Sequence, residues 1–136
     1  MGALIAGVLI LIAMLLQMLG FTGTCTMGAS GTLTTGAVLS SLPLGLAVYL
    51  TYRASKKDNS RGLPMIPASL AVGMFCLTAP AWWSSLRFHT PCGDDYEFYS
   101  PELGADDFLF LASYLVFPLL VVLAARPWSI GRLKSR

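Results

Sequence analysis

The sequence predicts an all-α integral membrane protein, a bundle of four transmembrane helices that forms one membrane domain over residues 1–136. Of the 136 residues, 55% are hydrophobic and 12% are charged, against about 25% charged in a typical soluble domain. The mean hydropathy is +0.68. This composition excludes a disordered chain. The nine basic and seven acidic residues lie mostly in different segments, so no nucleic-acid partner is expected.

The first two predicted spans lie in a stretch that has no charged side chain. From Met1 to Tyr52 there is no Asp, Glu, Lys or Arg. A spanning helix needs about 20 mostly apolar residues, and a charge at its centre costs roughly 2.5–3.5 kcal/mol. The Gly- and Thr-rich stretch within this region is typical of a turn. We therefore expect spans at residues 3–20 and 33–52, joined by an outer loop at 21–32.

Two further apolar stretches predict the third and fourth spans. Residues 66–86 and 108–125 contain no charged side chain. The polar segment 53–62 is expected to be a cytoplasmic loop, and the acidic, turn-rich segment 87–107 a longer outer loop. Residues 126–136 are expected to form a basic cytoplasmic tail.

The distribution of Lys and Arg predicts the orientation in the membrane. Eight of the nine basic residues fall on one side of the predicted spans, and only Arg87 falls on the other. The positive-inside rule then places both termini in the cytoplasm, and we expect the bacterial inner membrane. A cleaved signal peptide is the competing interpretation of the first 25 residues, but they lack a basic n-region. The residues that set this topology are Arg53, Lys56, Lys57, Arg61, Arg126, Arg132, Lys134 and Arg136.

Two of the three cysteines are expected on the outer side, where disulfides persist. A bridge between Cys25 and Cys92 would close a loop of about 67 residues and contribute on the order of 4 kcal/mol. The alternative is two thiols too far apart to meet. Cys76 lies within the third span and is expected to be inert packing. No Cys-x-x-Cys motif occurs, so the usual redox-active pair is missing.

Small residues spaced four apart predict where helices pack closely, because they let backbones approach each other in lipid. They are Ala3, Gly7, Ala37, Ser41, Gly45, Ser69 and Gly73. Gln17 is the strongest polar group of the first span and is expected to bond a neighbouring helix. Hydroxyls within the spans are expected to bond carbonyls of their own helix. We expect no catalytic, cofactor-binding or metal-binding residue.

The second outer loop carries the densest cluster of polar and aromatic side chains. Its carboxylates could bind calcium, but no Asp-x-Asp-x-Asp-Gly pattern is present, and a solvated acidic loop is the simpler interpretation. Aromatic residues beside charges also suit a protein contact surface. The candidates for contact with a partner are Trp82, Trp83, Tyr96, Phe98 and Tyr99.

These features predict a non-catalytic membrane subunit or accessory protein that packs against a larger membrane complex and stabilises it. A second hypothesis is a small oligomeric channel, a holin-like protein or a membrane immunity protein. A third is a membrane enzyme or transporter that uses His89 with the outer-loop carboxylates. The expected partners are the lipid bilayer and either a larger complex or further copies of this chain, with no cofactor.

Overall fold

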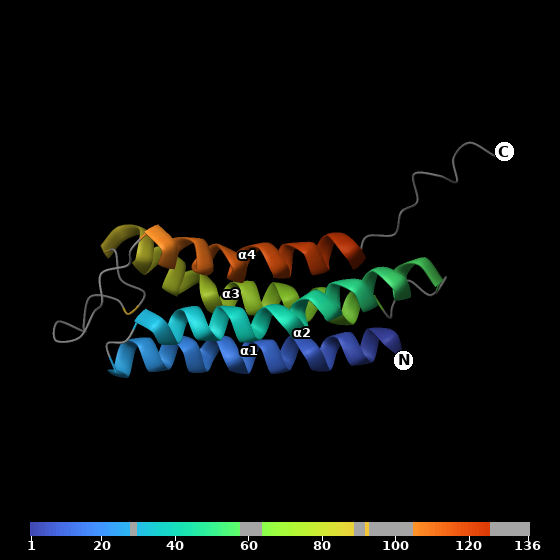
Figure 1. The fold of residues 1–136 in the computed structure, drawn as a ribbon. Helices are drawn as coiled ribbons and strands as arrows, with labels where there is room; N and C mark the ends of the chain where they lie inside the picture. The colour runs from blue at the N-terminus through green and yellow to red at the C-terminus, as the bar shows by residue number, and fades with distance from the viewer. Residues whose placement is uncertain (28–29, 58–63, 89–91, 93–104, 126–136) are drawn as a thin grey trace.

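The computed structural model describes residues 1–27, 30–57, 64–88, 92 and 105–125, and this part of the chain is all-helical. The four helices are α1 (Gly2–Met27), α2 (Ser30–Lys57), α3 (Met65–Phe88) and α4 (Ala105–Ala125). Figure 1 shows them side by side along a common axis, with successive helices running in opposite directions. The prediction of an all-helical bundle is therefore confirmed.

Three of the helices are long and apolar enough to cross a membrane, namely α1, α2 and α3. The described apolar stretch of α4, Leu111–Ala125, is shorter. On α1 even the outer surface is apolar: Leu15 is 62% exposed and Leu19 is 68% exposed. A helix that is hydrophobic on every face belongs in a protein core or in lipid. The fold is therefore consistent with a membrane protein.

The four helices form a bundle in which α1 and α4 lie diagonally opposite each other. Helix α1 packs against α2 and α3, and α4 packs against the same two helices. Two groups of buried side chains fill the interior. The first consists of Ala6, Ile10, Ala13, Leu44, Ala47, Ala71, Met74 and Val121, and the second of Leu33, Ala37, Leu111 and Tyr114. The core is thus built mainly from small and aliphatic side chains.

The helices extend further than the predicted spans. The sequence predicted a loop at residues 21–32, whereas α1 continues to Met27 and α2 begins at Ser30. Threonine hydroxyls explain this difference: those of Thr22, Thr24 and Thr26 donate to the carbonyls four residues earlier, at 2.6–2.8 Å. Each hydroxyl is satisfied by its own helix, so a threonine-rich segment can stay helical without water. Helix α2 likewise runs on into the predicted loop 53–62 and ends at Lys57.

Glycines bring α1 and α2 unusually close together. A Cβ added at Gly36 would lie 3.0 Å from the Cα of Gly20 and 3.1 Å from the hydroxyl oxygen of Tyr114. A Cβ at Gly20 would meet the same hydroxyl oxygen at 3.4 Å. Backbones can approach this closely only where both residues lack a side chain. Gly20 therefore lies inside a helix crossing, and α1 continues past it instead of ending there as predicted.

Candidate functional site

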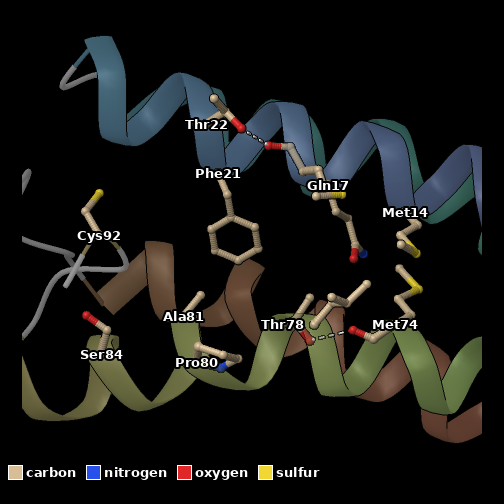
Figure 2. A pocket seen from close by; sticks show the side chains of 12 residues that line it. Met14, Gln17, Phe21, Thr22, Met74, Thr78, Pro80, Ala81, Ser84 and Cys92 are labelled. Atoms are coloured by element: carbon tan, nitrogen blue, oxygen red, sulfur yellow. Dashed lines mark hydrogen bonds between the residues drawn. The ribbon is translucent and has the colours of Figure 1, made fainter.

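A cavity of about 380 Å³ lies between α1 and α3. This volume is near the lower end of the range for small-molecule sites, about 300–1,000 Å³. Figure 2 shows the side chains of the two helices facing each other across it. The wall consists of Met14, Gln17, Met18, Phe21 and Thr22 from α1, of Met74, Leu77, Thr78, Pro80, Ala81 and Ser84 from α3, and of Cys92. The described part of this wall contains no charged side chain.

Gln17 places the only side-chain amide of the wall against the cavity. The side chain is 1% exposed, and its Nε2 donates to the hydroxyl oxygen of Ser40 on α2 at 3.3 Å. The hydroxyl of Ser40 in turn donates to the carbonyl of Ala37 at 3.1 Å. Because Ser40 has a single proton and gives it to Ala37, its oxygen must accept from Gln17. With its Nε2 bonded to Ser40, the amide leaves its oxygen, Oε1, without a donor among the described residues.

The threonine hydroxyls of the wall are committed to their own helices. Thr22 donates to the carbonyl of Met18 at 2.6 Å. Thr78 lies within reach of two carbonyls, those of Met74 at 3.2 Å and Phe75 at 3.1 Å. Back-bonding of this kind was predicted for hydroxyls in the spans, and Thr35 and Ser41 of α2 show it as well. Neither threonine of the wall has a proton left for Gln17 Oε1.

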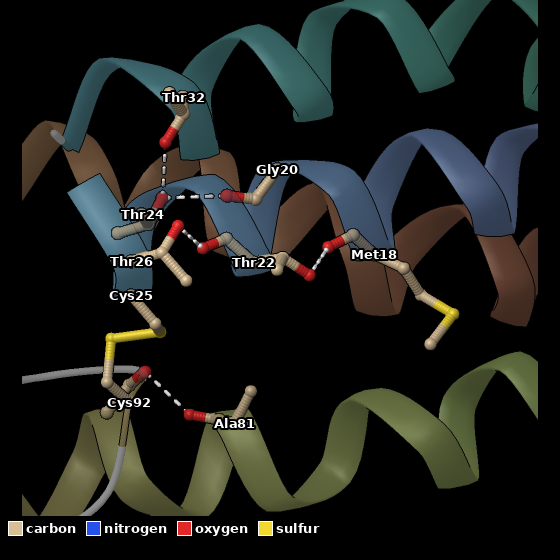
Figure 3. The surroundings of a disulfide bond; sticks show 10 residues. Met18, Gly20, Thr22, Thr24, Cys25, Thr26, Thr32, Ala81 and Cys92 are labelled. Atoms are coloured by element: carbon tan, nitrogen blue, oxygen red, sulfur yellow. Dashed lines mark hydrogen bonds between the residues drawn. A yellow bond between two sulfur atoms is a disulfide. The ribbon is translucent and has the colours of Figure 1, made fainter. Parts of the chain in front are cut away.

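A disulfide closes one end of the cavity. The structure joins Cys25, near the end of α1, to Cys92, with a Cα–Cα distance of 5.4 Å and a sequence separation of 67 (Figure 3). This Cα–Cα distance lies within the usual range for a disulfide. Cys92 also belongs to the cavity wall. The covalent bond therefore ties the segment after α3 to α1 beside the cavity. Cys76, expected to be packed, is instead an exposed free thiol.

The residues predicted to pack helices together fall into two groups. Ala3, Gly7 and Ala37 are buried, and a Cβ at Gly7 would meet Leu70 Cδ1 of α3 at 3.3 Å. Ser41 is half-buried, whereas Gly45, Ser69 and Gly73 are exposed. A Cβ at Gly45 or Gly73 would find no atom within 4 Å. These positions lie on the outer faces of α2 and α3, because those helices turn other faces toward the bundle.

The predicted partner-contact and topology residues lie mostly outside the described residues. Trp83 is 67% exposed, whereas Trp82 packs against the core group that contains Tyr114. Arg53 and Lys56 are exposed, and the Lys56 ammonium lies 5.8 Å from the ring centre of Tyr52. Lys57 ends α2, and its side chain is not described. Outside the described residues lie His89, Tyr96, Phe98, Tyr99, Arg61, Arg126, Arg132, Lys134 and Arg136.

Sequence reasoning singled out one residue of the cavity wall, Gln17, and the cysteine at its end. It missed the methionines that face each other there, Met14 and Met74, and it missed Phe21 by assigning it to a loop. No spacing or composition distinguishes these two methionines from the other four in the chain. The one available signal was Gln17 itself, since a side-chain amide in an otherwise apolar span requires partners.

Within the described ranges, no three His, Cys, Asp or Glu side chains come close enough to hold a metal ion. Comparisons with protein families, with curated proteins and with solved structures found no match to this chain.

Proposed function

We propose that this chain is a four-span integral membrane protein that acts as a non-catalytic accessory subunit and stabilises a larger membrane complex. The observation that carries the proposal is a row of small residues on the outer face of α3. Ser69, Gly73 and Cys76 follow one another at helical spacing, and all three are exposed. Small residues on an outer face allow the backbone of a second helix to approach closely. We infer that a helix of another membrane chain packs there.

The outer face of α1 differs from this row of small residues on α3, and the difference supports the proposal. Its exposed residues are large and apolar, as at Leu4, Val8 and Leu15, which are 55%, 56% and 62% exposed. Large aliphatic side chains suit contact with acyl chains and give a protein partner no close approach. We therefore assign α1 to lipid and the outer face of α3 to the partner.

The proposal of a fourth span is based on the length of α4 and on its packing within the bundle. The uncharged residues 108–125 of α4 correspond to about 27 Å of helix, near the roughly 30 Å of a bilayer core. Helix α4 also packs on both α2 and α3, so it completes the bundle. With four spans and the basic residues as distributed, both termini lie in the cytoplasm. The bacterial inner membrane remains the membrane we propose.

Cysteine labelling tests the orientation. In a Cys76→Ala background, Ser100→Cys and Ser135→Cys are each treated with a membrane-impermeant maleimide on intact cells. We expect labelling of the first variant only, and labelling of the second after the cells are lysed. Equal labelling of both variants on intact cells would contradict four spans with cytoplasmic termini.

Purification in mild detergent tests the subunit role. We expect a different protein to co-purify in fixed stoichiometry with the tagged chain, and Gly73→Leu to lower its recovery at least several-fold because a leucine blocks helix approach. Val72→Leu is the matched control, since Val72 is a neighbouring exposed residue at 51%. A uniform homo-oligomer that conducts ions would instead support the small-channel hypothesis. Full recovery of the partner with Gly73→Leu would refute packing on this face.

A further inference from the structure

One buried polar atom of the cavity has no partner within the described chain. Gln17 Oε1 lies in a side chain that is 1% exposed, and no donor reaches it. Figure 2 shows the amide hanging from α1 into the space between α1 and α3. A buried carbonyl oxygen that has given up water without gaining a donor is unfavourable. The described residues therefore leave Gln17 Oε1 open to a donor supplied by a bound molecule.

A water molecule fits this place poorly. Buried waters usually make about three hydrogen bonds to otherwise unsatisfied groups. Here the wall around the amide is mainly apolar, with Met14, Met74 and Phe21 among its residues. The nearby hydroxyl of Thr78 already donates to its own helix. The cavity combines one unpartnered acceptor, Gln17 Oε1, with a mainly apolar wall. A molecule that has one hydrogen-bond donor and an otherwise apolar surface matches both.

We propose that the cavity binds a small, neutral, phenol-like molecule whose hydroxyl donates to Gln17 Oε1. Neutrality follows from the absence of charged side chains in the described wall, because an unpaired charge would be costly there. An aromatic body suits Phe21 and the two methionine side chains, since rings pack well on other rings and on thioether sulfur. The volume of about 380 Å³ accommodates a compact ligand.

The position of the opening indicates how such a molecule enters. Met18 of α1 and Leu77 of α3 both line the cavity and are 50% and 56% exposed. The cavity therefore opens sideways between the two helices. If the helices span the membrane as proposed above, this opening faces the bilayer, and the ligand enters from its apolar phase. Only this route rests on the proposed function, whereas binding itself does not.

Two probes that differ by one donor test the proposal on the purified chain in detergent. 2-Naphthol carries a hydroxyl and 2-methoxynaphthalene does not, and binding of each is measured by fluorescence against a blank of empty micelles. We expect saturable binding of 2-naphthol that is about threefold to tenfold tighter than that of its ether, the effect of one net hydrogen bond. No saturable binding above the blank, or equal affinity for the two probes, would overturn the proposal.

Variants of the wall separate the hydrogen bond from the cavity. Gln17→Met keeps the size and flexibility of the side chain but removes the oxygen, so the preference for 2-naphthol should disappear. Thr51→Val is the matched control: Thr51 is a buried polar residue of α2, away from the cavity, whose hydroxyl also has no partner. It should retain the full preference. A preference that survives in Gln17→Met would refute the assigned contact.

A filling substitution covers the case in which Gln17→Met does not fold. Ala81→Phe adds a ring to the α3 wall and should abolish binding of both probes. Unchanged binding of 2-naphthol to this variant would show that the probe lies elsewhere and would overturn the proposal. Because the assay uses the isolated chain without partner or bilayer, its failure is distinct from failure of the subunit role.

Discussion

The hydroxyl of Tyr114 on α4 donates a hydrogen bond to the backbone carbonyl of Leu33 on α2, at 3.1 Å and 81 residues away in the sequence. The ring of Tyr114 is fully buried and meets Phe21 of α1 edge to face, with ring centres 5.2 Å apart. The hydroxyl oxygen also lies where Gly20 and Gly36 leave room for it. A single tyrosine therefore links α4 to the crossing of α1 and α2.

Tyr114→Phe tests this link. The substitution keeps the ring and removes only the hydroxyl, so we expect unfolding in detergent to become easier by about 1 kcal/mol, the usual value of one net hydrogen bond. The loss should stay modest because the Leu33 carbonyl, as part of a helix, can still accept from its own helix. Tyr49→Phe is the control, since Tyr49 is 53% exposed. An equal effect of both substitutions would contradict a specific role for the Tyr114 hydroxyl.

Gly36→Ala tests the close approach of α1 and α2. The added methyl would lie 3.0 Å from Gly20 Cα and 3.2 Å from the carbonyl oxygen of Leu16. Both neighbours are backbone atoms that cannot rotate away, so we expect a loss of about 1–3 kcal/mol in the free energy of unfolding.

Gly45→Ala is the matched control for this prediction, because a Cβ there meets nothing within 4 Å. We expect unchanged or slightly higher stability, since alanine has the better helix propensity. Thermal unfolding of both variants in the same detergent gives the comparison. Equal stability of Gly36→Ala and the wild type would show that the helices are further apart than described.

The number and type of helices could be predicted from the sequence because charge is excluded from hydrocarbon. Stretches without Asp, Glu, Lys or Arg correspond to the apolar lengths of α1, α2 and α3. The helix ends could not be predicted as well. Thr22, Thr24 and Thr26 resemble a turn in sequence, but their hydroxyls bond within the helix. Composition alone cannot distinguish these two uses of threonine.

The sequence predicted least well which face of each helix points into the bundle. In a helix of a soluble protein the polar face marks the outside. Helix α1 is apolar on every face, so its sequence does not show which face points into the bundle. Gly20 and Gly36 meet in the interior, whereas Gly45 and Gly73 face outward, although all four are glycines in apolar segments. Which of them packs depends on the crossing geometry of the helices. The position of the cavity depends on the same geometry, and Gln17 was the one residue in the sequence that indicated it.

Reduction of the disulfide should destabilise the fold. The bond between Cys25 and Cys92 encloses a separation of 67 residues, for which restriction of the unfolded chain gives about 4 kcal/mol. We expect the Tm in detergent to fall on addition of a phosphine reductant. Maleimide counting after denaturation should give one reactive thiol before reduction, that of Cys76, and three afterwards.

Cys76→Ala separates the disulfide from the free thiol. This variant should show the same fall in Tm on reduction as the wild type and no reactive thiol before it. A wild-type Tm that does not respond to reduction, with three thiols already reactive, would contradict the bond.

The contact between Gln17 and Ser40 should appear as a coupling energy across α1 and α2. A double-mutant cycle with Gln17→Met and Ser40→Ala isolates it, because each substitution removes one partner of the 3.3 Å hydrogen bond. We expect about 0.6 kcal/mol, the average for such bonds between membrane helices. The same cycle with Ser41→Ala should give a coupling near zero, since the hydroxyl of Ser41 donates to Val38 of its own helix. Equal coupling in the two cycles would mean that Gln17 does not distinguish these neighbouring serines.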